Sequence, residues 1–265
     1  MKKLLLMAAA IGLTVSLFAQ NVVGSWKVKK YGISVGMDQD MISGLSHTYL
    51  MNTVKGSSDF QYENIPFGEE DLFSMTCENP NIRAEVTLLP PRMRNTELRL
   101  AVAGMFNRVD AVTFRVQDGQ DYRSLSFDSY TNEIALEGAL LKRLTILNTF
   151  NLYGGVGMNL GVSFDGSMYV DGQNLAVSEN GAFGASDDAY VGDGFEMYDR
   201  FSDYYNIKNG LHQRAFVQAG FGLMIMRRLE LGVDAKYGIG YRLIGGSAKQ
   251  TNLNYAGFTA KWILK

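Results

Sequence analysis

Apolar and polar residues alternate strictly near the end of the chain, and this pattern constrains the fold more than any other feature. Between residues 229 and 243, every odd position is aliphatic or aromatic, and every even position is glycine or a charged residue. Strand side chains alternate between the two faces of a sheet, whereas a helix repeats about every 3.6 residues. The segment is therefore predicted to be a strand, more than twice as long as the usual ~5–6 residues.

The same alternation predicts seven further strands. They cover residues 31–37, 82–88, 98–106, 134–140, 154–164, 215–225 and 256–264. The connections are short at 90–95, 142–149 and 227–228, long at 38–80, 107–131 and 165–211, and modest at 244–250. Short connections on one side and long ones on the other are typical of an outer-membrane barrel. We therefore predict an all-β, up-and-down antiparallel transmembrane β-barrel of eight strands with long extracellular loops.

The second long connection continues the alternation of the strand before it. Val112, Phe114 and Val116 keep the parity of that strand, and Asp118-Gly119 is a favourable hairpin turn. We expect an ordered extension of the hairpin here, with these three side chains on the outer face.

A soluble β-sandwich is the competing fold, since its strands also alternate. Its two sheets would share a core and rarely need eight strands of this length. The glycine-rich faces of these strands carry full charges, which a dry core does not accept unpaired. The pattern favours the barrel, with the apolar face toward lipid.

The parity of each strand identifies the charged side chains that face the interior. The acidic ones are Glu85, Glu97, Glu133, Glu137, Glu230 and Asp234, and the basic ones are Lys30, Arg83, Arg99, Lys236, Arg242 and Lys261. The two signs balance, and an eight-stranded barrel is just wide enough for its side chains to fill. We expect a closed, charge-paired interior, and a narrow or gated pore is the alternative.

Composition and the first residues limit location and function. Residues 1–19 resemble a signal peptide, with Lys2 and Lys3 before an apolar stretch and Ala19 at its end, so residues 20–265 form the predicted barrel domain. The net charge of -2 argues against nucleic acid as a partner. The single cysteine, Cys77, excludes a disulfide framework and a cysteine-based zinc site. We expect no cofactor.

The third long connection is acidic and rich in aromatic residues. Its acidic residues are Asp165, Asp171, Glu179, Asp187, Asp188, Asp193, Glu196, Asp199 and Asp203, against Arg200 and Lys208. Divalent-cation binding and recognition of a protein or glycan are the functional interpretations, and a solvated loop is the simpler one. The spacing from Asp187 to Glu196 does not match an EF-hand loop. The first loop, with Glu69, Glu70 and Asp71, leads to the same alternatives.

The sequence offers little support for catalysis. It has two histidines: His47 beside Ser46 in the first loop, and His212 at the start of the sixth strand. Adjacent Ser and His residues are not a catalytic arrangement by themselves. The glycines at 154–157 lie inside a strand and do not open a helix, so they form no phosphate-binding loop. We expect no enzyme activity, and a lipid A-modifying barrel is the less favoured alternative.

The chain resembles small OmpA-like outer-membrane β-barrel proteins, also called porin-family barrels. The resemblance rests on the repeated amphipathic strands, the glycine-aromatic segment 153–164 and the final strand 255–264. It implies a monomer in the cell outer membrane, with membrane lipid and lipopolysaccharide around it. It also implies that the barrel assembly machinery reads the final strand through Gly257, Phe258, Trp262 and Leu264. The chain departs from the family pattern at Lys265, where an aromatic residue is expected.

Overall fold

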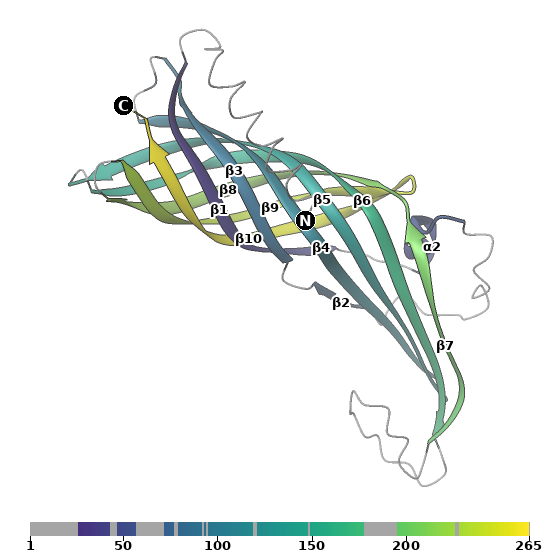
Figure 1. Cartoon of the computed structure of the whole chain (residues 1–265). Helices are drawn as coiled ribbons and strands as arrows, with labels where there is room; N and C mark the ends of the chain where they lie inside the picture. Colours follow the sequence, from purple (N-terminus) through teal and green to yellow (C-terminus); the bar gives the residue numbers. More distant parts are fainter. Residues whose placement is uncertain are drawn as a thin grey trace.

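The computed structural model describes residues 26–42, 47–56, 72–76, 79–91, 93, 95–118, 121–147, 149–177, 195–225 and 228–264. Within them, ten strands belong to one sheet and one short helix stands apart (Figure 1). The strands are β1 (Lys27–Ile42), β2 (Leu72–Thr76), β3 (Asn79–Leu89), β4 (Thr96–Asp118), β5 (Asp121–Ile146), β6 (Phe150–Val177), β7 (Phe195–Ile207), β8 (Gly210–Ile225), β9 (Leu229–Ile244) and β10 (Ser247–Ile263). The helix is α2 (His47–Thr53).

Eight of the strands close into a barrel. The ring runs β1–β3–β4–β5–β6–β8–β9–β10, and β10 pairs with β1, for example at Tyr31↔Trp262. Every neighbouring pair is antiparallel, and the ring follows chain order. The predicted all-β, up-and-down barrel of eight strands is therefore confirmed. β2 and β7 lie outside the ring and pair with β4 and β6.

The barrel is apolar outside and polar inside. Phe258 and Leu136 expose 76% and 64% of their surface, whereas the interior side chains of Thr251 and Lys261 are fully buried. In β8 and β9, exposed and buried residues alternate along most of the strand. This arrangement follows from the period of two, because each ring strand has one face toward the lumen and one away from it.

Two β-bulges invert the alternation in the longest strands. The register of β4 shifts between Met105 and Arg108, around Asn107, which has a positive φ of 55°. β6 has a matching irregularity at Asp165, with φ of 53°. A bulge inserts one extra residue, so each side chain beyond it moves to the opposite face. The prediction that Val112 lies on the outer face is therefore wrong: Val112 is buried inside, and the side chains of Phe114 and Val116 lie outside the described residues.

Three ring strands extend well beyond the rest of the barrel. β4 and β5 remain paired as far as Asp118↔Asp121, so the second long connection is an ordered hairpin extension, as predicted. β6 continues to Val177 and is flanked there by β7. Together with β2, these strands form a projecting sheet at one end of the barrel (Figure 1). Residues 178–194, which include much of the predicted acidic loop, lie outside the described residues.

The connection between β9 and β10 is shorter than the sequence suggested. The predicted link over residues 244–250 is only a two-residue turn, because the strands stay paired up to Ile244↔Ser247. Gly245 and Gly246 both have positive φ, at 60° and 86°. Two successive positive φ angles are typical of the tight hairpin turns that match strand twist, and glycine adopts them without strain.

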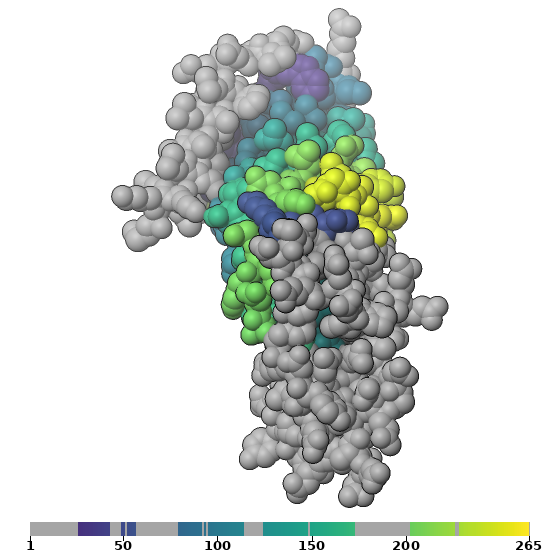
Figure 2. Space-filling view, turned by 90° about the vertical axis from the view of Figure 1, so that its right-hand side faces the viewer, coloured from purple at the N-terminus to yellow at the C-terminus, as the bar shows by residue number. Residues whose placement is uncertain are grey.

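Helix α2 lies over the end of the barrel from which the sheet projects. After the helix, Val54 forms a bridge with Ile207, and the Lys55 and Lys208 amides donate to the carbonyls of Asn206 and Thr53, each over 2.8 Å. The atoms of α2 lie between the green atoms of β7 and β8 and the yellow atoms of β10 (Figure 2). The sequence predicted only a loop here.

An apolar cluster, which we call the cap, joins α2 to the inner faces of the projecting strands. It consists of Ile42, Tyr49, Leu50, Val54, Val112, Leu125, Phe127, Met168, Val170, Ile207 and Ile244, with Tyr205 packed against it.

No helix among the described residues is long and apolar enough to cross a membrane.

Replacing Gly36 with alanine should destabilise the barrel by about 1–3 kcal/mol, because the added methyl overpacks the β1–β10 seam. Its Cβ would lie 2.7 Å from the Gly257 Cα and 2.5 Å from the Tyr255 ring. Urea unfolding of the detergent-folded protein, followed by tryptophan fluorescence, measures the change. Gly138→Ala is the matched control, since its Cβ would meet only Leu100, at 3.7 Å. Equal unfolding free energies for the two variants would contradict the packing at this seam.

Candidate functional site: the barrel lumen

All twelve charged side chains assigned to the interior from the sequence are buried within the barrel. They are Lys30, Arg83, Glu85, Glu97, Arg99, Glu133, Glu137, Glu230, Asp234, Lys236, Arg242 and Lys261. Each has at least one ion pair with another interior charge. The pairs form successive layers from the end with short turns, which we call the turn end, to the end covered by α2.

The first layer closes the turn end. Lys30 contacts Glu230 at 3.0 Å and Glu97 at 3.3 Å. Arg143, on β5, bridges the same two carboxylates, with 2.5 Å between its Nη1 and Glu97. Asn151 donates to Glu230 at 2.8 Å. Two cations and two carboxylates thus compensate one another at this end of the lumen, which lowers the free-energy cost of burying them.

The second layer crosses the barrel from β4 to β9. The Arg99 Nη1 lies 3.4 Å from Asp234, and the Arg99 guanidinium lies 3.9 Å from the centre of the Tyr153 ring. The Tyr153 hydroxyl donates to the same aspartate. Beside this group, Lys261 pairs with Glu85 at 3.1 Å. The aromatic face adds a cation–π contact to the ion pair, so Arg99 is held from two directions.

The third layer lies near the middle of the lumen. Lys236 pairs with Glu137, and the Arg83 Nε lies 3.4 Å from the same carboxylate. Arg83 also contacts Asp38 at 3.4 Å and stacks 3.5 Å above the Tyr255 ring. Planar guanidinium groups suit such sites, because they bind carboxylates and stack on aromatic rings at the same time.

The fourth layer is the most tightly connected. Arg108 contacts Asp40 at 2.7 Å and Glu133 at 3.5 Å. Arg214 pairs with both of these carboxylates, at 3.3 Å for Glu133. His212 places its Nε2 3.1 Å from Glu133. Two arginines on different strands thus share two carboxylates, and no member can be removed without leaving another charge uncompensated.

The last layer lies beneath the cap. Arg242 contacts Asp110 at 2.6 Å and donates to the Thr131 hydroxyl at 3.4 Å. Arg108 reaches the same aspartate from below, at 2.9 Å. Beyond this layer the lumen becomes apolar, and Val112 and Phe127 belong to the cap. The barrel is therefore filled by charges along most of its length and by apolar side chains at one end.

Sequence reasoning missed six interior charges, for two reasons. Asp38, Asp40, Arg143 and Arg214 lie on strands that extend beyond their predicted bounds, and continuing the same parity would have found them. Arg108 and Asp110 lie beyond the bulge of β4, where even rather than odd positions face inward. Asn107, a residue type that tolerates positive φ, was the available signal for that bulge.

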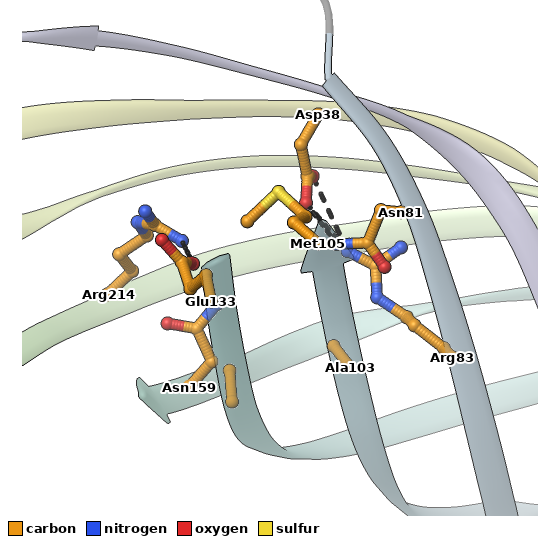
Figure 3. A pocket seen from close by; sticks show the side chains of 9 residues that line it. Asp38, Asn81, Arg83, Ala103, Met105, Glu133, Asn159 and Arg214 are labelled. Atoms are coloured by element: carbon orange, nitrogen blue, oxygen red, sulfur yellow. Dashed lines mark hydrogen bonds and ion pairs between the residues drawn. The ribbon is translucent and has the colours of Figure 1, made fainter. Parts of the chain in front are cut away.

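A small polar cavity lies between the third and fourth layers (Figure 3). Arg83 and Asp38 stand on one side of it, and Arg214 and Glu133 on the other. Its volume is only about 10 Å³. That space suits about one water molecule, so the cavity does not form a passage for solutes.

The remaining predicted residues occupy defined places. Phe258 and Trp262 are exposed on the outer face of β10, Gly257 faces inward against Tyr255, and Leu264 follows the strand. The side chain of His47 lies outside the described residues. In the part of the chain that is described, no group of three or more His, Cys, Asp or Glu side chains could hold a metal ion.

The outer face of the projecting sheet carries aromatic and acidic side chains. Tyr169 and Tyr204 pack with ring centres 4.8 Å apart, and Tyr204 is 70% exposed. Partial burial, together with the carboxylate of Asp171, raises the pKa of Asp128 on the neighbouring strand. The face thus presents paired rings beside crowded carboxylates.

These features define a closed eight-stranded β-barrel with an ionic lumen and an apolar exterior. No protein-family model matches the sequence, and no curated protein is significantly similar to it. Solved structures that align with the chain include Neisserial surface protein A, with 10% identity, 91% of this chain and 99% of that one covered, and a TM-score of 0.36.

Two further solved structures align over a similar length. The outer membrane protein OprG from Pseudomonas aeruginosa has 11% identity, 90% and 97% coverage, and a TM-score of 0.41. Ail, the attachment invasion locus protein of Yersinia pestis, was crystallised with the heparin analogue sucrose octasulfate. It has 12% identity, 88% and 99% coverage, and a TM-score of 0.27.

Replacing Arg108 with methionine should destabilise the barrel by about 3–5 kcal/mol, because it leaves Asp40 and Asp110 buried with fewer cations. Urea unfolding in detergent measures the loss. A double variant, Arg108→Met with Asp40→Asn, should recover part of it, since Glu133 then keeps Arg214 and Asp110 keeps Arg242. A double variant less stable than the single one would contradict the role of Asp40 as the partner of Arg108.

Proposed function

We propose that this protein is an outer-membrane β-barrel that crosses the bilayer with its eight ring strands. The support is the outer face, where large apolar side chains are exposed around the whole ring. They include Ile33, Ile82, Leu136, Val156, Val217, Ile239 and Phe258, from seven different strands. A monomer in water rarely exposes a continuous apolar surface of this extent, whereas lipid covers it without penalty.

The barrel is closed to solutes, and one observation carries this conclusion. Arg99–Asp234 and Arg242–Asp110 each join β4 to β9. These strands are opposite each other in the ring of eight, so the two ion pairs span the full width of the lumen. A channel would need these bridges to open, and buried charges separate only at considerable cost.

The protein reconstituted in planar bilayers should therefore give no steady conductance steps. In the same lipid, the unboiled protein should migrate differently from the boiled protein on a gel, which checks that a folded barrel was inserted. Regular conductance steps from inserted protein would favour the porin-like alternative. Absence of a heat-dependent shift, together with full solubility without detergent, would reject the membrane barrel itself.

The projecting sheet gives this barrel a structural or recognition role at the cell surface. The paired rings of Tyr169 and Tyr204 lie on an exposed face, and Asp171 lies on the same face of β6. Exposed aromatic groups are common in recognition surfaces because they offer large, rigid contact areas. The partner that this face fits is an extracellular protein or glycan.

Shortening the β6–β7 hairpin should abolish binding of the extracellular protein or glycan and leave the barrel folded. Replacing residues 168–205 with Asn-Gly removes the projecting part of β6 and most of β7, and retains the ring pairing below Gly166↔Ile207. Vesicles carrying the whole chain or the shortened chain are applied to arrays of glycans and extracellular proteins. Equal binding by both, with the gel shift intact, would reject the hairpin as the recognition element.

The remaining parts of the proposal concern assembly and export. Residues 1–19 act as the signal peptide, and the barrel assembly machinery reads Gly257, Phe258, Trp262 and Leu264 on the closing strand. Membrane lipid and lipopolysaccharide surround a monomer that needs no cofactor and catalyses no reaction. Placement among OmpA-like proteins is supported by the amphipathic strands and by the closing strand.

A further inference from the structure

The turn end of the barrel is cationic on its surface. Lys27 and Lys29 lie at the start of β1, Lys142 at the end of β5, and Arg228 just before β9. Strand pairing brings these segments to the same end, since Lys27 pairs with Leu89 and Lys142 with Thr96. Lys27, Lys142 and Arg228 are exposed, and Lys29 is half-buried.

No exposed carboxylate accompanies these cations among the described residues of the turn end. The carboxylates there are Glu97 and Glu230, and both are buried in the lumen. They are neutralised by Lys30 and Arg143 in the first ionic layer. The surface charge of this end is therefore positive, although the whole chain has a net charge of -2.

The opposite end carries exposed or half-buried acidic side chains. Asp128, Asp165, Asp171 and Asp203 lie on the projecting strands or at their base. The lysines of this end, Lys55, Lys208 and Lys249, cluster around α2, where Lys208 donates to the Asn52 carbonyl and Lys249 lies over the Tyr49 ring. Positive surface charge without carboxylates is thus a property of the turn end.

Exposed apolar side chains lie at the same end of the barrel as these cations. Leu147, at the tip of the β5–β6 turn, is 83% exposed and has a positive φ of 53°. A leucine gains nothing from this backbone conformation, which favours glycine or asparagine. Met93 and Trp262 are also exposed at this end. Cations together with exposed apolar side chains are typical of surfaces at the boundary between lipid headgroups and acyl chains.

We propose that the turn end binds the phosphates of anionic phospholipids in the leaflet that surrounds it. The proposal rests on the membrane-spanning barrel of the proposed function and names the lipid class that this end selects. Exposed lysine and arginine side chains within about 10 Å of an anionic surface are attracted to it at moderate salt. The apolar tips insert beside them and hold the cations at headgroup depth.

Spin-labelled lipids in phosphatidylcholine vesicles that contain the folded full chain test this proposal. At about 50 mM salt, the protein should prefer spin-labelled phosphatidylglycerol over spin-labelled phosphatidylcholine at least about twofold. The variant K27Q/K29Q/K142Q/R228Q should lose this preference. About 1 M salt should abolish it as well, because the Debye length falls to about 3 Å.

The matched control neutralises four charges at the other end. D128N/D165N/D171N/D203N should keep the full preference for phosphatidylglycerol, and equal loss in both quadruple variants would overturn the proposal. So would equal association of the two lipids with the unaltered protein. Inorganic phosphate at constant ionic strength should not compete, and competition would assign the cations to free phosphate instead.

The gel shift separates this inference from the proposed function. Each protein is checked for heat-dependent mobility in the same vesicles. A normal shift without lipid preference rejects only the headgroup site, whereas a missing shift in the unaltered protein rejects the membrane barrel.

Discussion

Charge compensation inside the lumen is the constraint on which the rest of this structure depends. A buried charge is tolerated only when an opposite charge lies close to it, and the barrel wall separates these groups from solvent. The fourth layer illustrates the consequence, because Asp40 and Glu133 each serve two arginines. Strands that are far apart in the sequence are thereby held at fixed positions around the ring.

The network fixes geometry more than it adds stability. Buried ion pairs often contribute little net free energy against apolar replacements, but removal of one partner is costly. In this barrel the partners come from β1, β3, β4, β5, β8, β9 and β10, so a shift in register would separate several pairs at once. We infer that the ionic lumen selects one register and one closure of the ring.

Two different kinds of side chain, charged and apolar, fill the barrel. Paired charges fill it from the turn end to Asp110, and apolar side chains of the cap cover the other end. The change coincides with the projecting sheet, where the inner faces of β4, β5 and β6 have no opposite barrel wall. Because these inner faces have no charged groups opposite them, their side chains are apolar. Helix α2 packs over these apolar side chains and shields them from solvent.

Local alternation was enough to predict the eight ring strands and the burial side of twelve charges, because strand geometry fixes side-chain direction every second residue. The same rule failed beyond Asn107, since a single extra residue inverts the faces. The predicted strand also ended before Asp38 and Asp40, because aspartate is common in turns and was taken to mark the end of the strand. Helix α2 carried no strong pattern, and its short length leaves its formation to tertiary contacts.

The sequence by itself determined that this chain forms long strands with one apolar and one charged face, and hence that the sheet must close on itself. Only the tertiary structure decided which charges meet, because pairs such as Arg99–Asp234 join residues brought together by the ring and not by the chain. It also decided that Lys27, Lys29, Lys142 and Arg228 meet at the turn end without exposed carboxylates among the described residues. Alternation is a local property of the backbone, whereas the choice of ion-pair partners depends on strand order, register and the width of the lumen.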